Sequence, residues 1–183
     1  MIFVWILIAI VVVAVIYLIA TYNGLVRFRN QIENAWAQID VQLKRRYDLI
    51  PNLVETVKGY ASHERATLDA VIQARNLGLN AQGPRDQAEA ENVITGALKS
   101  VFALSEAYPD LKANQNFLNL QEELTGTEGR IAYARQYYND AVFKYNTKIQ
   151  SFPAVVIANS LKFSAREYFE ADDENRGPVQ VQF

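Results

Sequence analysis

The sequence predicts an all-α protein in which an N-terminal transmembrane helix continues into a long antiparallel bundle of three to four helices. Three observations support this prediction. The first twenty residues carry no charged side chain, and Arg27 is the first charged residue of the chain. Beyond them, apolar residues recur in steps of three and four, which is the period of an amphipathic helix. Proline and glycine then divide this pattern into segments of helix length.

Residues 2–20 are expected to cross a membrane and to contact its lipid. A helix rises about 1.5 Å per residue, so this run is roughly 30 Å long, the thickness of a hydrocarbon core. A cleaved signal peptide fits poorly, because no basic residue precedes the run and no convincing cleavage site follows it. Arg27 and Arg29 follow the span, so the positive-inside rule places the N-terminus outside and the body in the cytoplasm.

Residues 22–50 are predicted to continue the span as one helix, because their apolar residues form a single stripe. The stripe consists of Leu25, Phe28, Ile32, Trp36, Ile39, Leu43, Tyr47 and Ile50. Pro51 should kink or restart the helix, since a proline in a helix interior costs about 3 kcal/mol. The stripe resumes at Leu53, and we expect helix as far as about Leu79, before the loop at residues 80–84.

Two further long helices are predicted. The first covers residues 85–107 and is ended by residues 108–110, which include a proline. The second and longest covers residues 117–149 in a near-heptad register. Gly126 and Gly129 interrupt that register. They either break the helix or allow close approach of a neighbouring helix, and we favour the close approach.

The predicted organisation is a transmembrane helix at residues 1–22, a cytoplasmic helical bundle at residues 23–165 and a C-terminal tail at residues 166–183. The formal net charge of the chain is −2, so it has no basic excess for binding nucleic acid. Cysteine is absent, which excludes disulfides, thiolate metal sites and a cysteine nucleophile.

The residue inventory predicts no catalytic, cofactor-binding or metal-binding residue. His63 is the only histidine, and no nucleophile elbow lies near it, so we expect it on the surface or in a turn. Tyr60 stands three residues before His63, so the Glu-x-x-His pair of helical di-metal sites is absent. No glycine-rich phosphate-binding motif occurs either. The expectation is a protein that is not an enzyme and has no cofactor.

Several side chains are candidates for a subunit interface or for contacts that hold the bundle together. The cluster Lys44-Arg45-Arg46 should pair with carboxylates of a packed helix or of a neighbouring chain, with anionic lipid as the alternative. Tyrosines crowd the last long helix, where they mark either an interface or a core in which carbonyl groups accept their hydroxyls. The candidates are Trp36, Arg45, Arg46, Asp48, Pro51, Asn52, Glu123, Glu128, Arg135, Tyr138 and Tyr145.

The last five residues alternate apolar and polar side chains like a β-strand. Val179, Val181 and Phe183 are the candidate docking residues of this tail, which could add to a protein partner as a strand. A disordered end is the alternative.

Motifs along nearly the whole chain resemble the LemA family. The most specific is the block Leu49-Ile50-Pro51-Asn52-Leu53-Val54, within a similar stretch from Ala35. Further matching pieces are Val57-Lys58-Gly59-Tyr60, Ala74-Arg75-Asn76, Glu123-Leu124, Ala134-Arg135, Tyr138-Asn139, Tyr145-Asn146 and Phe152-Pro153. The resemblance implies a single-span bacterial inner-membrane protein with its N-terminus outside and a cytoplasmic helical bundle. The biochemical role of the family is poorly defined.

The sequence therefore favours a non-enzymatic membrane scaffold that forms a homo-oligomer and recruits protein partners through its tail. The alternative is an accessory subunit of another membrane complex, such as a protease or transporter. A membrane-remodelling assembly is a weaker alternative, because a transmembrane anchor replaces the amphipathic lipid-binding helix that such assemblies use.

Overall fold

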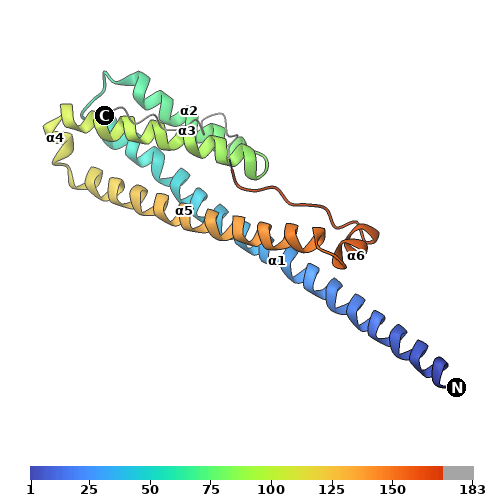
Figure 1. Ribbon diagram of the computed structural model, residues 1–183. Helices are drawn as coiled ribbons and strands as arrows, with labels where there is room; N and C mark the ends of the chain where they lie inside the picture. The colour runs from blue at the N-terminus through green and yellow to red at the C-terminus, as the bar shows by residue number, and fades with distance from the viewer. Residues whose placement is uncertain (171–183) are drawn as a thin grey trace, which may run out of the picture. The chain divides into compact units, whose positions relative to one another are not determined.

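The computed structural model describes residues 1–170, and every regular element in this part of the chain is helical (Figure 1). The elements are α1 (Ile2–Lys58), α2 (Arg65–Asn80), α3 (Gly83–Leu104), the 3-10 helix η1 (Ser105–Ala107), α4 (Pro109–Lys112), α5 (Gln115–Gln150) and α6 (Ala154–Ser160). The predicted class is confirmed: the protein is all-α, and a long apolar N-terminal helix continues into a helical bundle.

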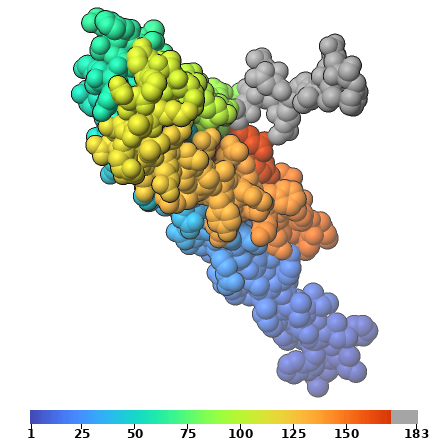
Figure 2. Space-filling view, turned by 90° about the vertical axis from the view of Figure 1, so that its left-hand side faces the viewer, coloured from blue at the N-terminus to red at the C-terminus, as the bar shows by residue number. Residues whose placement is uncertain are grey.

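The first part of α1 is a candidate membrane span. An 18-residue window of it reaches a mean hydropathy of 3.3, and none of that window is buried within the protein. Figure 2 shows these side chains, in dark blue, standing clear of the orange segments of unit 1 on the visible face. A fully exposed apolar helix of this length has the dimensions of a bilayer's hydrocarbon core.

The chain divides into two units, and α1 and α5 contribute to both of them. Unit 1 contains residues 1–38 and 136–167, and unit 2 contains residues 39–135 together with the described residues 168–170. In unit 1, the end of α5 packs antiparallel to α1. The rings of Trp36 and Tyr138 lie 5.5 Å apart, and Gln31 donates a 3.2 Å hydrogen bond from Nε2 to the hydroxyl of Tyr137.

Unit 2 has a core built from α1, α2, α3 and α5. Its apolar stripes supply the side chains that are fully buried, each of which stabilises the fold by about 1.5–3 kcal/mol relative to exposure. They include Ile39, Ile50, Leu53, Val57, Val71, Ile94, Val101, Phe117 and Leu124. The core of unit 2 therefore follows the helical period read from the sequence.

The helix expected from Leu53 to about Leu79 is interrupted. α1 stops at Lys58, and a turn over residues 59–64 leads into α2, so the expectation of unbroken helix over that stretch is wrong. His63 lies exposed in this turn. The apolar stripe lapses after Ala61, which is buried within the turn, and the next buried residue is Leu68 on α2.

α1 also continues through Pro51 to Lys58, so of the predicted kink or restart at that proline, the restart is wrong. A proline has no N–H, which leaves the carbonyl group four residues earlier without its helical donor. That carbonyl belongs to Tyr47, and the Nε of Arg75 on α2 donates to it at 2.8 Å. A side chain from another helix thus replaces the missing main-chain donor.

α5 is uninterrupted across Gly126 and Gly129. A Cβ built at Gly129 would meet no other described atom within 4 Å, and one at Gly126 would meet only Nη2 of Arg130 at 3.9 Å. The predicted close approach of a neighbouring helix is therefore wrong for the described part of the chain. Among the described residues, Gly129 faces open space and Gly126 faces only the end of a long arginine side chain.

α6 ends in a Schellman motif. The amide of Phe163 donates to the carbonyl of Ala158 at 2.9 Å, and that of Lys162 donates to the carbonyl of Asn159 at 3.2 Å. Lys162 takes the left-handed conformation at φ 57°, a position that usually belongs to glycine. A side chain at such a position costs about 1 kcal/mol or more.

Candidate functional site

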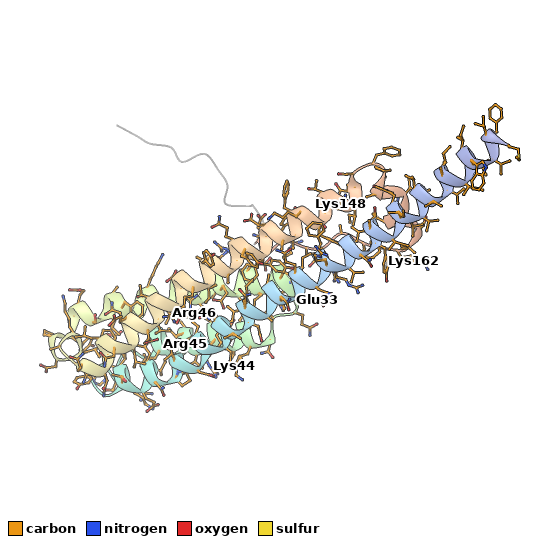
Figure 3. The ribbon with its side chains drawn as sticks, turned by 90° about the horizontal axis from the view of Figure 1, so that it is seen from below. Glu33, Lys44, Arg45, Arg46, Lys148 and Lys162 are labelled. Carbon is orange, nitrogen blue, oxygen red and sulfur yellow. The ribbon has the colours of Figure 1, made fainter. Side chains whose placement is uncertain are left out.

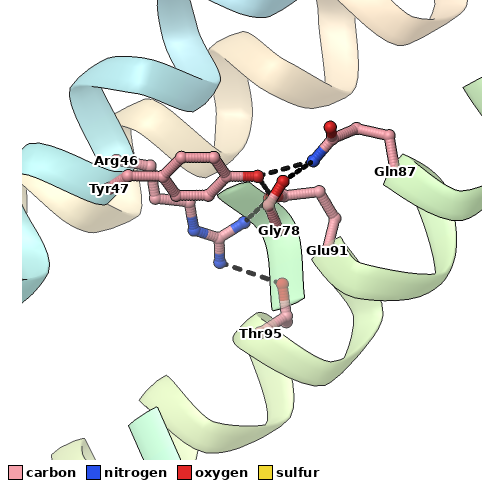
Figure 4. A network of polar contacts seen from close by, with 6 residues as sticks. All are labelled: Arg46, Tyr47, Gly78, Gln87, Glu91 and Thr95. Atoms are coloured by element: carbon pink, nitrogen blue, oxygen red, sulfur yellow. Dashed lines mark hydrogen bonds and ion pairs between the residues drawn. The ribbon is translucent and has the colours of Figure 1, made fainter. Parts of the chain in front are cut away.

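The most enclosed polar site of unit 2 lies where α1, α2 and α3 meet (Figure 4). We call it the Arg46 network. α1 contributes Arg46 and Tyr47, and α3 contributes residues 87, 91 and 95 at helical spacing, so all three share one face of that helix. The same face carries Ala88 and Ile94. Because these apolar side chains pack in the core, the polar side chains beside them are buried as well.

A carboxylate stands at the centre of the Arg46 network. Glu91 accepts a 2.8 Å hydrogen bond from Nη1 of Arg46 and a 2.5 Å hydrogen bond from the hydroxyl of Tyr47. Nη2 of Arg46 donates to Oγ1 of Thr95 at 2.9 Å, and Nε2 of Gln87 donates to the Tyr47 hydroxyl at 2.6 Å. The Arg46 and Glu91 side chains are only 2% and 7% exposed, so this is a buried ion pair.

Burial sets the protonation of the network. It raises the pKa of Glu91, and the hydrogen bonds and positive charge supplied by Tyr47 and Arg46 oppose that rise. Burial also raises the pKa of Tyr47, and the neighbouring Glu91 carboxylate raises it further. The Tyr47 hydroxyl therefore stays protonated and remains a donor well above its ordinary pKa.

A glycine of α2 makes room for Tyr47. A Cβ built at Gly78 would lie 2.5 Å from the Tyr47 hydroxyl oxygen and 3.0 Å from Cδ1 of Ile94. No side chain fits at that separation, so only glycine allows α2 to pass this close to the ring.

These contacts connect α1 with both helices of the α2–α3 hairpin. Breaking a buried ion pair by removing one partner typically costs 3–5 kcal/mol, because the other charge stays buried and unpaired. Nε of Arg46 is already a buried donor with no hydrogen-bond partner within the described residues. The network can hold helices in one arrangement, which is a positioning role.

The other predicted residues of unit 2 lie near its surface. Nη2 of Arg45 donates to Oε2 of Glu123 at 2.5 Å, and both side chains are 47% exposed. Asn52 and Glu123 line one shallow hollow of about 350 Å³, together with Thr56, Asn116, Asn119 and Leu120. The remaining predicted residues of this unit are exposed: Asp48, Pro51, Glu128 and Arg135.

In unit 1, Tyr138 and Tyr145 are buried side chains whose hydroxyls find main-chain acceptors. Both reach residues 161–167, an irregular segment that we call the strap. Tyr138 donates to the carbonyl of Glu167 at 2.9 Å, and Tyr145 donates to that of Ser164 at 3.0 Å. Burial raises the pKa of both tyrosines. Trp36 lies half-buried against the ring of Tyr138.

Asn146 completes the attachment of the strap. Its Nδ2 donates to the carbonyl of Arg166, and its Oδ1 accepts from the amide of Arg166, both at 2.9 Å. One amide side chain thereby satisfies both main-chain groups of one strap residue, as a neighbouring strand would. Tyr138, Tyr145 and Asn146 together hold the part of the strap that follows the Schellman motif, where the chain has no helix or strand.

A second hollow, of about 590 Å³, lies in unit 1, and side-chain amides form much of its wall. It is lined by Asn23, Val26, Arg27, Asn30, Gln31, Asn34, Gln38 and Tyr137. Within residues 1–170, no group of three or more His, Asp or Glu side chains is placed to hold a metal ion.

Sequence reasoning missed Tyr47, Glu91, Thr95 and Asn146 as site residues. A signal existed for two of them. Glu91 stands three residues from both Ala88 and Ile94, on the apolar face of its helix, and Asn146 lies beside Tyr145 within an apolar register. The candidate docking residues Val179, Val181 and Phe183 lie outside the described part of the chain.

Known proteins are similar to most of this chain. The profile of the LemA family matches residues 35–183. Protein LemA of Metamycoplasma hominis is 29% identical over 163 residues, covering 87% of this chain and 73% of that protein. Magnetosome protein MamQ 2 of Paramagnetospirillum magneticum is 25% identical over 203 residues, covering 94% of this chain and 75% of that protein. Magnetosome protein MamQ of Magnetospirillum gryphiswaldense is 23% identical over 188 residues, covering 88% and 69%. With a family match over most of its length, the chain belongs to the LemA family.

Proposed function

We propose that this protein is a non-enzymatic helical scaffold anchored in the bacterial inner membrane, with its body on the cytoplasmic side. The observation that supports it most is α1, a single helix that carries both the exposed apolar run and buried core positions such as Leu25 and Ile39. An unbroken helix joins the anchor to the folded body without a flexible linker. Arg27 and Arg29, directly after the run, support the cytoplasmic orientation.

The scaffold forms a homo-oligomer. Unit 2 exposes large apolar side chains that the described residues do not cover, among them Val41, Leu77, Leu79 and Tyr133. Tyr133 is 74% exposed on α5. Tyrosine is enriched at protein interfaces because its ring buries much area while its hydroxyl stays hydrogen-bonded. Contact with further copies would remove this surface from water.

The C-terminal tail, residues 166–183, recruits protein partners, with Val179, Val181 and Phe183 as the contact residues. The alternation of apolar and polar residues at the end of the chain supports this role, because an extended segment can add to the edge of a partner's sheet. Deleting residues 179–183 should then abolish capture of those partners and leave the mass of the scaffold unchanged.

The test of the scaffold is the mass of the full-length protein in mild detergent, measured by light scattering with the detergent subtracted. A discrete particle many times 20.7 kDa supports it. Tyr133→Ser should then lower that mass, whereas Lys99→Ser, an exposed change on α3, should leave it unchanged. A monomeric wild-type protein overturns self-assembly and favours an accessory subunit, whose partner complex should co-purify from native membranes.

A further inference from the structure

We propose that this protein has a second lipid contact, in which residues 152–163, comprising α6 and its flanks, lie on the anionic surface of the membrane crossed by residues 2–20. We call residues 152–163 the α6 segment. This inference rests on the proposed membrane anchor and adds a site to it. The observations behind it are the place of the segment along α1, its exposed apolar side chains, its charge and its backbone.

The α6 segment lies level with the end of the apolar run. Tyr137 on α5 contacts Gln31 on α1, and the two helices are antiparallel in unit 1. Thirteen residues further along α5 is Gln150, and thirteen residues back along α1 is Leu18. The Tyr22 and Phe163 rings meet at 6.0 Å, which ties the segment to the residues directly after the run.

The α6 segment exposes large apolar side chains at this level. Phe152 is 84% exposed, Val156 is 60% exposed and Leu161 is 47% exposed, all within ten residues of chain. Ala154 and Ala158, by contrast, are buried and Val155 and Ile157 are half-buried, so α6 packs within unit 1 mainly through its small residues and exposes Val156. An element of this kind at the end of a membrane span is suited to insert shallowly among lipid headgroups. Phe152 and Tyr22 fit the aromatic belt found at that depth.

The charge around the α6 segment selects an anionic surface. Between Asp140 and Glu167 the sequence has four basic residues and no acidic one: Lys144, Lys148, Lys162 and Arg166. Residues 1–32 likewise carry Arg27 and Arg29 and no acid. Figure 3 shows Lys148 and Lys162 at the end of unit 1 nearer the apolar run, with Glu33 further from it. The chain as a whole is acidic, with a net charge of −2, so this concentration of cations is local. Basic residues beside a span are attracted to anionic lipids.

The backbone at Lys162 is the fourth observation. Its φ of 57° is the conformation in which glycine would be unstrained. Non-glycine residues in this conformation are concentrated at functional sites. A lysine here places a cation at the end of α6, beside the exposed Leu161.

The sequence contains no cysteine, so a single introduced cysteine can be labelled selectively with an environment-sensitive fluorophore. Val156→Cys reports on the α6 segment, and Val93→Cys on α3 is its control, since both valines are exposed to a similar degree, at 60% and 50%. Val12→Cys reports on the apolar run. Each full-length variant is reconstituted into vesicles of phosphatidylcholine and phosphatidylglycerol in equal parts, with spin-labelled lipids as quenchers. Leu161→Cys serves as an independent probe if Val156→Cys does not fold.

We expect a quencher placed near the headgroups to quench the label at position 156 several-fold more than the label at 93, and a quencher placed deep to quench the label at 12. Omitting phosphatidylglycerol should reduce quenching at 156. The double change Lys148→Gln and Lys162→Gly should remove that dependence on anionic lipid, while Lys99→Gln on α3 should not.

Three results would overturn the lipid contact. If the label at 12 is quenched and that at 156 matches the label at 93, the α6 segment faces water although the anchor stands. A blue-shifted but unquenched label at 156 means that a second copy of the chain covers the segment. If the label at 12 is also unquenched, the membrane anchor itself is wrong, and the lipid contact falls with it.

Discussion

Nε of Arg75 donates a 2.8 Å hydrogen bond to the main-chain carbonyl of Tyr47, the group that Pro51 leaves without a helical donor. Pro51 on α1 and Arg75 on α2, both in LemA-like motifs, therefore act on the same main-chain carbonyl group. The proline deprives a main-chain carbonyl of the longest helix of its N–H donor, and the arginine of the next helix supplies a side-chain donor in its place.

This relationship predicts coupling between positions 51 and 75. Pro51→Ala restores the missing N–H and should raise the free energy of unfolding by up to about 3 kcal/mol. Arg75→Met should lower it by about 1–3 kcal/mol in the wild type, because the Tyr47 carbonyl loses its donor. In the Pro51→Ala background the same change should cost clearly less. Urea unfolding in mild detergent, followed by circular dichroism, measures the cycle, and equal losses in both backgrounds would contradict it.

The buried ion pair predicts a contrast between adjacent arginines. Arg46→Met should lower the free energy of unfolding by about 3–5 kcal/mol, since Glu91 would remain buried without its cation. Arg45→Met removes only an ion pair that is half-exposed on both sides, and should change it by no more than about 1 kcal/mol. Adding Glu91→Leu to Arg46→Met should restore most of the loss. Equal effects of the two single changes would refute the central place of the Arg46 network.

The glycines predict opposite responses to alanine. Gly126→Ala and Gly129→Ala should each raise the free energy of unfolding by about 0.5–1 kcal/mol, because the new methyl group on a helix collides with no described atom. Gly78→Ala should lower it, because its methyl group would collide with the Tyr47 hydroxyl. Thermal unfolding of the three variants in detergent decides the matter. A destabilising change at position 129 would reveal a neighbour that the described chain does not contain.

Tyr47 predicts loss of stability at alkaline pH. Its folded-state pKa is raised, so below pH 10 the phenol is protonated in both the folded and the unfolded states, and its ionisation has no effect on stability. Above pH 10 the unfolded state releases the proton while the folded state keeps it, so the free energy of unfolding falls as pH rises. Tyr47→Phe should unfold more easily at neutral pH but lose less stability above pH 10. An unchanged slope in that variant would assign the alkaline effect to other buried tyrosines, such as Tyr138 and Tyr145.

The helical period of the sequence was enough to predict the fold class, the long helices and most of the core. It did not predict the end of α1 at Lys58. The turn that follows contains Gly59 but no proline, and the tyrosine at position 60 made the apolar stripe look continuous. The continuity of α1 through Pro51 was equally hidden, because the compensating donor lies on another helix, at residue 75. Local rules describe what a proline removes, whereas only tertiary structure shows what replaces it.

The candidate site, too, could be predicted from the sequence only in part. The arginine cluster at residues 44–46 was recognisable as a set of cations in need of partners. Which carboxylate meets which arginine depends on how the helices pack. In unit 2 the neighbours Arg45 and Arg46 point to different helices, one to Glu123 on α5 and the other to Glu91 on α3. The buried Asn146 shows that a polar residue within an apolar register can signal a main-chain segment in need of hydrogen bonds.

The strap of residues 161–167 also determines how this protein responds to proteases. Irregular surface segments with small and polar residues are the usual sites of proteolytic nicking, and Ser164-Ala165-Arg166 has that composition. Trypsin must draw the main chain on both sides of Arg166 into its active site, yet Asn146 occupies the amide and the carbonyl of that residue. Cleavage after Arg166 is therefore limited by local opening of the strap and not by the exposure of its side chains. The rate of that cut measures how firmly α5 holds the strap.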